Sequence, residues 1–290
     1  MRKTGLFLAS IVLSATLWAE LPEKKGLDVI NRANAEAYIG FLASDALEGR
    51  EAGFRGGRIA GEYIVSNLKT MGIEPLFESY YQPFEAYNKE RQKKGRFQVH
   101  PDSIAKLKQG VHQKLSMNNI LGKIEGKNPN EYVIIGAHYD HLGFDPMLDG
   151  DRVYNGADDN ASGVSAVLQV AKAFLATGVQ PERTVIFAFW DGEEKGLLGS
   201  KYFVQTFSEM DKVKGYLNYD MIGRNKDESK PMHVVYFYTE AHPVFGDWLK
   251  NDIKKYGLNL TPDYRPWDKP VGGSDNASFA LLDIPVIWYH

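Results

Sequence analysis

Alternation between apolar strands and amphipathic helices is the feature that most constrains the fold. From Asn118 onward, near-continuous apolar runs such as YVIIGA and VIFAFW alternate with helical segments such as SGVSAVLQVAKAFLAT. Strands that are apolar on both faces must be covered on both faces, which favours a mostly parallel sheet between two helical layers. We therefore predict an α/β three-layer sandwich with a mostly parallel, mixed sheet.

Hydrophobic periodicity places the expected elements. Helices are expected over most of 27–50 and over 59–71, with a glycine- and charge-rich loop between them and Gly72 at the second helix end. Residues 80–117, with the basic run NKERQKKGRF, are expected to form an irregular, solvated hairpin or excursion. Neither its path nor that of 261–275 follows from the pattern. Later strands are expected at 119–126, 131–138, 183–190, 215–221, 233–238 and 284–290, and helices at 162–177, 196–207 and 242–257.

Composition limits the partners and the chemistry. The 290 residues are 43% hydrophobic and 24% charged, which suits one large domain or two small ones. The formal net charge of -3 favours neither nucleic acid nor an acidic membrane as a partner. Because the chain has no cysteine, any metal must be held by His, Asp and Glu. The oligomeric state cannot be inferred from these features.

The N-terminus has the pattern of an export signal. The positive MRK precedes the apolar GLFLASIVLSATLWA, and after Ala19 the sequence becomes polar. The apolar run is shorter than the roughly 20 residues of a membrane span. We predict a signal peptide at 1–19 and a periplasmic or secreted mature chain from 20 to 290 without a membrane span. The alternative is an uncleaved N-terminal anchor.

Polar residues follow several of the predicted strands. In open α/β sheets the working residues gather just past the carboxyl ends of the strands. The candidates at these positions are His138, Glu193, Glu194, Asp220 and His290. Their shared position is the first evidence for a site.

Two loops add further candidates. In GAHYDHLGF, the histidines belong either to a hydrogen-bonded loop or to a metal site, in which Asp140 would accept the second ring N–H of His138. In NGADDNASG, three polar residues precede a helix, whereas capping needs one. An extra carboxylate there can reach a cation in front of the sheet.

The segment FWDGEEKGLLGS ends a buried strand in two glutamates. If the backbone is extended there, their side chains point in opposite directions. One glutamate can then bind metal while the other acts as a general base. Asp220, between apolar residues in LNYDMIG, must also be paired or bound. Together the segments predict a two-metal hydrolase site, with zinc preferred and manganese or cobalt as alternatives.

The motifs GAHYDH, NGADDNASG, DGEEKGLLGS and NYDM occur in this order and together resemble the two-zinc aminopeptidases of peptidase family M28. The resemblance extends from LASDALEGREAG to the chain end. It implies a zinc-peptidase sandwich of the phosphorylase/hydrolase-like type and one catalytic domain over 20–290. It also implies hydrolysis of the N-terminal peptide bond of peptides with a free N-terminus.

The same resemblance implies a role for each candidate. Glu193 resembles the general base, and Asp140 resembles the residue that orients His138. The implied metal ligands are His138 and Asp220 for one zinc, Glu194 and His290 for the other, and Asp159 as the bridge.

The chain departs from the family pattern at two places. Asn276 stands where the family often has His, so we expect altered pocket chemistry without loss of metal. Family members continue beyond the final His, so the C-terminal end of the domain is expected to be missing here. Two other functions stay open: a one-zinc glutaminyl-peptide cyclase of the same fold and a non-catalytic binding relative. The complete ligand set argues against both.

Overall fold

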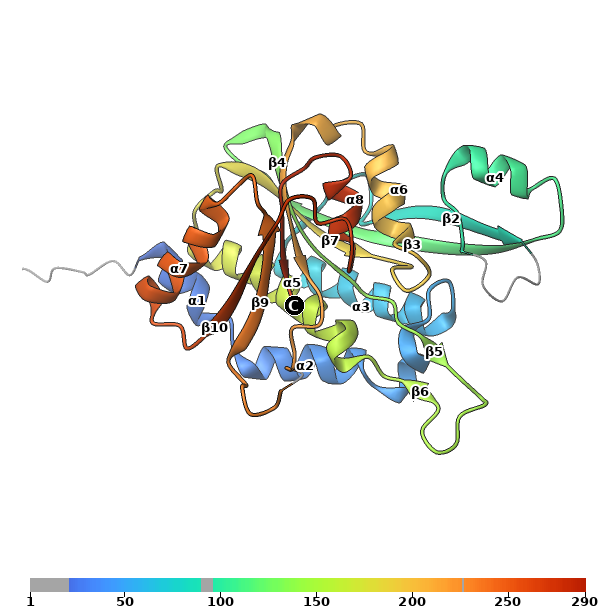
Figure 1. Ribbon diagram of the computed structural model, residues 1–290, viewed down its shortest axis with the longest axis horizontal. Coiled ribbons are helices and arrows are strands. Elements are labelled where there is room, and N and C mark those ends of the chain that lie inside the picture. Colours follow the sequence, from blue (N-terminus) through green and yellow to red (C-terminus); the bar gives the residue numbers. More distant parts are fainter. Residues whose placement is uncertain (1–20, 90–95, 226) are drawn as a thin grey trace, which may run out of the picture.

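The sheet has the predicted mixed α/β organisation. The computed structural model describes residues 21–89, 96–225 and 227–290, and the predicted signal peptide at 1–19 lies outside them. Within these residues, nine strands form one sheet in the order β1–β3–β7–β4–β8–β11–β9–β10, with β2 paired to β3 (Figure 1). The strands are β1 (Glu74–Pro75), β2 (Tyr81–Lys89), β3 (His112–Ile124), β4 (Asn128–His138), β7 (Arg183–Trp190), β8 (Val213–Tyr219), β9 (His233–Thr239), β10 (Thr261–Trp267) and β11 (Val286–Tyr289).

Parallel strands form the centre of the sheet. β4 runs parallel to both β7 and β8, and β11 runs parallel to β8. Antiparallel pairing occurs between β3 and β7, between β1 or β2 and β3, and between β11 and β9. A separate short ribbon pairs β5 (Gly143–Phe144) with β6 (Val153–Tyr154).

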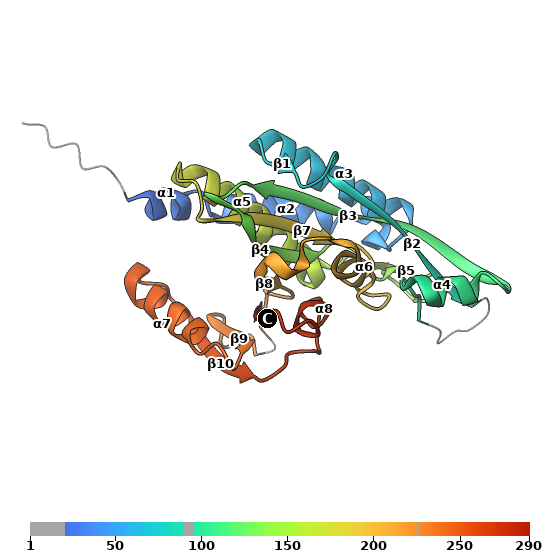
Figure 2. The same cartoon turned by 90° about the horizontal axis from the view of Figure 1, so that it is seen from above.

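Helices cover both faces of the sheet, as predicted (Figure 2). One layer contains α1 (Pro22–Asp28), α2 (Arg32–Leu42), α3 (Arg55–Met71) and α5 (Gly163–Thr177). The other contains α6 (Leu198–Thr206), α7 (Val244–Tyr256) and α8 (Asn276–Ala280). Among the described helices, none has both the length and the apolar character that crossing a membrane requires.

Alternation along β7 explains why the sheet needs two helical layers. Phe187 and Phe189 pack into the core with α2, α3 and α5. Ile186, Ala188 and Trp190 enter the opposite core with α6 and α8. All five side chains are fully buried, because successive residues of a strand point to opposite faces. A strand of this kind is stable only between two apolar layers.

The N-terminal helices are interrupted where a single helical stretch was expected. The stretch expected over 27–50 divides into α1, α2 and a short 3-10 segment, Asp45–Arg50. The side chain of Asn31 accepts a hydrogen bond from the Asn34 N–H at 2.9 Å and thereby caps α2. The expected end at Gly72 is confirmed, since this residue caps α3 with a left-handed backbone.

The segment at 80–117 is more regular than expected. β2 and β3 form a long antiparallel hairpin that protrudes from the domain and carries α4 (Pro101–Leu107) near its tip (Figure 1). Pro83 obscured this strand in the sequence, because proline is rare inside sheets. The proline is tolerated here because β2 lies at the edge of the sheet, where β3 is its strand partner and a single bridge, Tyr87 to Gln98, occupies the other side. Residues 261–267, whose path did not follow from the sequence, form β10.

Truncation of Phe187 tests the contribution of this core. Phe187→Ala removes a fully buried ring and should lower the free energy of unfolding by about 3–5 kcal/mol. The matched control, Phe54→Ala, removes a ring that is 49% exposed and should change it by less than about 1 kcal/mol. Urea unfolding followed by circular dichroism measures both, and equal effects would contradict the packing described.

Candidate metal centre

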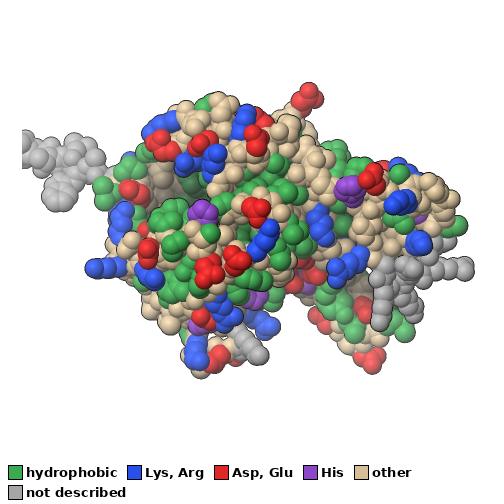
Figure 3. Space-filling model, turned by 45° about the horizontal axis from the view of Figure 1, so that its top comes forward, with side chains coloured by type: hydrophobic (Ala, Val, Ile, Leu, Met, Phe, Trp, Pro, Cys, Tyr) green, Lys and Arg blue, Asp and Glu red, His purple; other side chains and the backbone are tan. Residues whose placement is uncertain are grey.

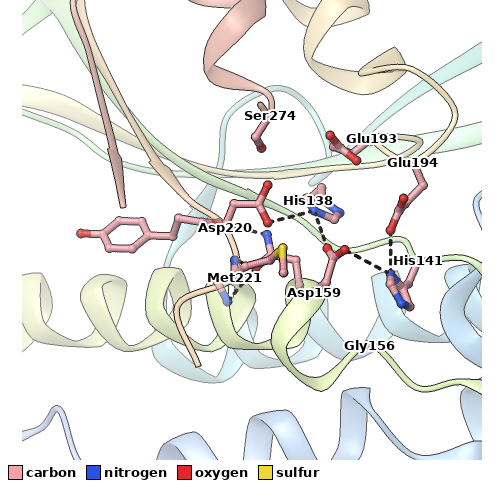
Figure 4. A network of polar contacts seen from close by, with 12 residues as sticks. His138, His141, Gly156, Asp159, Glu193, Glu194, Asp220, Met221 and Ser274 are labelled. Carbon is pink, nitrogen blue, oxygen red and sulfur yellow. Dashed lines mark hydrogen bonds and ion pairs between the residues drawn. The ribbon is translucent and has the colours of Figure 1, made fainter. Parts of the chain in front are cut away.

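The carboxyl ends of three neighbouring strands bring the candidate residues together. β4 ends at His138, β7 ends at Trp190 just before the two glutamates, and β8 ends at Tyr219 just before Asp220. Because β4 lies between β7 and β8, the loops that follow all three strands meet at one edge. Figure 4 shows side chains from these loops pointing toward one another, with Asp159 from the N-terminal approach to α5 among them.

The first group consists of His138, Asp159 and Asp220. The Nε2 atom of His138 lies 3.2 Å from Oδ1 of Asp159 and 3.5 Å from Oδ1 of Asp220. One ligand atom from each residue lies within 4.8 Å of the others, so the three can hold one ion. The His138 ring is only 1% exposed, so these carboxylates dominate its surroundings.

The second group consists of His141, Asp159 and Glu194. The Nδ1 atom of His141 lies 2.7 Å from Oε1 of Glu194 and 3.9 Å from Oδ2 of Asp159. Asp159 thus turns one carboxylate oxygen toward each histidine, and the two groups share it (Figure 4). His141 was not among the sequence candidates, although GAHYDH contains it. The presence of a second histidine in this motif is the sequence feature that could have identified it.

Asp140 fixes the turn that carries both glutamates. Its Oδ1 accepts the N–H of Glu193 at 3.0 Å, and its Oδ2 accepts the N–H of Glu194 at 3.3 Å. The Nδ1 atom of His138 lies 3.2 Å from the Asp140 carbonyl oxygen and 3.6 Å from its Oδ1. Fully buried Asp140 therefore faces both the first histidine and the backbone of the glutamates.

The expectation of an extended backbone at the two glutamates is wrong. Gly192 has a φ of 78°, and the Glu193 carbonyl accepts the N–H groups of Gly196 and Leu197 in a turn. The turn nevertheless separates the two side chains. The Glu194 carboxylate contacts His141, whereas the Glu193 carboxylate lies beside both groups and forms no hydrogen bond or ion pair with their described residues (Figure 4).

His290 lies outside both groups. Its Nδ1 is 3.2 Å from the Asp220 carbonyl oxygen, and its backbone pairs with Val235. Its assignment as a metal ligand stays a prediction. Asn276 is also away from the groups, fully buried, and its amide donates to the carbonyls of Pro270 and Gly272.

Arg50 is a buried cation, whereas the sequence pattern predicts only that it belongs to a loop. Its guanidinium donates to the carbonyls of Tyr139, Asn155 and Gly156 at 2.7–2.9 Å, and to that of Leu42. It thereby joins the loop after β4 to the loop that carries Asp159. Burial lowers the pKa of Arg50 to about 10, opposed by Asp140, Asp159 and Glu194. The side chain still keeps its positive charge at neutral pH.

The crowded carboxylates shift the protonation of their neighbours. Burial acts to lower the pKa of His138, but Asp220, Asp140 and Asp159 outweigh it and raise this pKa well above the ordinary value. Burial also raises the pKa of Glu193 to about 9, an effect that His138 opposes and Asp275 reinforces. Without another cation, protons therefore offset part of the negative charge.

The donor atoms of the two groups are chemically suited to a divalent metal. The buried Oδ1 of Asp220 has no hydrogen-bond partner among the described residues, although it faces the first group. Such an atom is costly unless a cation or a donor meets it. Imidazole nitrogen with carboxylate oxygen is a donor set that suits zinc.

Comparisons with known proteins show which proteins this chain is similar to. Residues 119–290 match the model of peptidase family M28. Leupeptin-inactivating enzyme 1 of Streptomyces exfoliatus is 34% identical over 170 residues, which span 58% of this chain and 34% of that protein. The chain thus spans only about a third of that relative.

Solved structures share the fold. The LapA aminopeptidase of Legionella pneumophila superposes with a TM-score of 0.64 at 22% identity, covering 100% of this chain and 68% of that one. A glutaminyl cyclase of Porphyromonas gingivalis superposes with a TM-score of 0.58 at 18% identity, covering 90% and 83%.

Removal of the shared carboxylate tests the metal centre. Asp159→Asn weakens both groups at once, so the zinc content per chain should fall to less than about half of that of the unaltered protein. Elemental analysis after equilibrium dialysis measures it. The control is Asp158→Asn, because Asp158 accepts the Gly223 N–H at 2.7 Å and belongs to neither group. Equal zinc content in both variants would remove Asp159 from the centre.

A second pair of variants tests the histidines. His141→Ala should weaken zinc binding at least about tenfold, since His141 either binds metal or orients Glu194. Calorimetric titration with zinc measures this affinity, and an unchanged value contradicts the placement of His141. A comparable loss in His290→Ala would add His290 to the ligand set, as the sequence predicts.

Proposed function

Because this chain belongs to peptidase family M28, we propose that it is a zinc-dependent aminopeptidase that uses two zinc ions to remove residues from free peptide N-termini. The main observation is the pair of ligand groups that share Asp159, with Glu193 beside them. Two-metal hydrolases use a shared carboxylate of this kind to hold both ions near one reacting bond.

The ligand assignment follows from the two groups. His138 and Asp220 would hold one zinc, Glu194 would hold the other, and Asp159 would bridge them. His141 and His290 are the candidates for the histidine of the second ion. Zinc in such a site supplies Lewis-acid chemistry that polarises a carbonyl and strengthens water as a nucleophile. Manganese or cobalt would suit the same donors.

Glu193 would act as general base and then as general acid. Its pKa of about 9, raised by burial, describes a carboxyl that holds a proton readily, and cations bound nearby would lower that pKa toward neutrality. Such a group can take a proton from the attacking water and give it to the leaving amine. Asp140 would keep it in place, because it accepts the Glu193 N–H.

Glutaminyl-peptide cyclization is the second candidate, because a solved glutaminyl cyclase shares the fold. A non-catalytic binding relative is the third. The presence of both ligand groups and of Glu193 favours the peptidase over either. We also propose that the protein acts in the periplasm or outside the cell, on the basis of the N-terminal signal pattern.

A mixture of short peptides tests the activity. With zinc, we expect stepwise loss of residues from peptides with a free N-terminus and none from N-acetylated peptides, followed by mass spectrometry. Loss of ammonia from a peptide with N-terminal Gln would instead support the cyclase. No reaction at all would favour the binding relative.

Glu193→Gln serves as the matched variant for this assay. It should keep zinc while lowering turnover roughly a hundredfold to ten-thousandfold, because the amide cannot accept the proton. Turnover close to that of the unaltered protein would exclude Glu193 as the base.

A further inference from the structure

A cavity lies beside Glu193 and Glu194. It has a volume of about 560 Å³, and Arg96, Phe97 and Lys201 also line it. Arg96 and Phe97 come from the protruding hairpin, whereas Lys201 lies on α6. A second cavity of about 180 Å³ shares Arg96, Phe97 and Lys201. The space beside the metal centre therefore has a wall that does not belong to the centre.

Two cations of this wall form no salt bridge with a described carboxylate. Within the described parts of the chain, no carboxylate lies within salt-bridge distance of Arg96 or Lys201, whereas Lys195 is held by Glu51 at 2.8 Å. Lys201 donates to the Gly196 carbonyl at 2.8 Å, which leaves two of its three N–H donors available. Figure 3 shows Lys and Arg side chains on this side, where the hairpin joins the body of the domain.

The position of the cavity defines which part of a substrate enters it. On the proposed function, Glu193 gives its proton to the leaving amine, so the leaving residue lies next to Glu193. Because Glu193 lines the cavity, the cavity would lie on the leaving-group side of the scissile bond. Each further peptide residue extends at most about 3.6 Å, so the α-carboxylate of a short peptide enters this space.

We propose that Arg96 and Lys201 form a carboxylate-binding subsite on the leaving-group side, which selects di- and tripeptides with a free C-terminus. This inference rests on the proposed function and names its substrate class. A guanidinium and an ammonium that face one cavity can each donate charge-assisted hydrogen bonds to a carboxylate. Burial and the neighbouring Arg96 lower the pKa of Lys201, and Asp275 and Glu193 oppose this shift.

Measurements of peptide affinity test the subsite in a variant that does not turn peptides over. In the zinc-loaded Glu193→Gln background, calorimetry compares Leu-Gly and Leu-Gly-Gly with their C-terminal amides. We expect the free acids to bind roughly tenfold more tightly than the amides, since a hydrogen bond to a charged group contributes about 1.5 kcal/mol. Adding Lys201→Met or Arg96→Gln should remove most of this preference while leaving amide binding unchanged.

The matched control is Lys172→Met. Lys172 is also a half-buried helical lysine, but it lies on α5 and lines a cavity with Tyr38 and Asn67. This variant should keep the preference for the free acid. With Arg96 and Lys201 both present, the difference in affinity between free acid and amide should also decrease as the salt concentration is raised, because charges near the surface are screened.

The outcomes separate the subsite from the activity. Equal affinity for acid and amide, a preference that survives both substitutions, or no binding of either peptide overturns the subsite. Hydrolysis of unblocked peptides with no acid preference leaves the aminopeptidase and removes the subsite. If the preference for the free acid depends on Lys201 and Arg96 but the unaltered protein hydrolyses no peptide, the subsite is supported and the proposed activity is refuted.

Discussion

Crowded negative charge at the ends of β4, β7 and β8 is the constraint around which the rest of this molecule is arranged. The sheet brings together buried or half-buried carboxylates that would repel one another in a medium less polar than water: Asp140, Asp159, Asp191, Glu193, Glu194, Asp220 and Asp275. Burial and Asp140 raise the pKa of Asp191 to about 7, which shows how strongly this crowding disfavours charge. Positive charge from His138 and Arg50 makes the arrangement tolerable, and a divalent cation would offset the negative charge further.

Arg50 meets this constraint without a salt bridge to any described carboxylate. Its donors reach backbone carbonyls from two loops, so they leave the carboxylate oxygens of the site available. Asp140 acts in the complementary sense, since it accepts backbone N–H groups of the glutamate turn. The relative positions of the loops therefore depend on main-chain contacts more than on contacts between functional side chains.

The sequence was sufficient for those parts of the fold that depend on periodicity. Alternation along β7 and the polar residues after β4, β7 and β8 predicted both the layers and the edge where the site lies. It was insufficient where a loop determines the direction of a side chain. The motif GAHYDH does not indicate which of its histidines contacts Glu194. The turn at Gly192 likewise has no periodic pattern in the sequence. Pro83 also made β2 difficult to predict from the sequence. A proline fits an edge strand, but whether a strand lies at an edge is visible only in three dimensions.

The hairpin of β2 and β3 contributes to the wall beside the centre, yet none of its described residues belongs to the two candidate ligand groups. β3 joins the sheet through β7, next to the strands that precede the ligands, while the far part of the hairpin pairs only with itself. On the proposed function and subsite, the molecule would keep its chemistry and part of its selectivity on separate pieces of chain. Substitutions in the hairpin can accumulate under different selection from those in the ligand loops. Exchange of this segment between relatives is therefore a natural route by which one centre acquires new substrates, and a practical one for redesign.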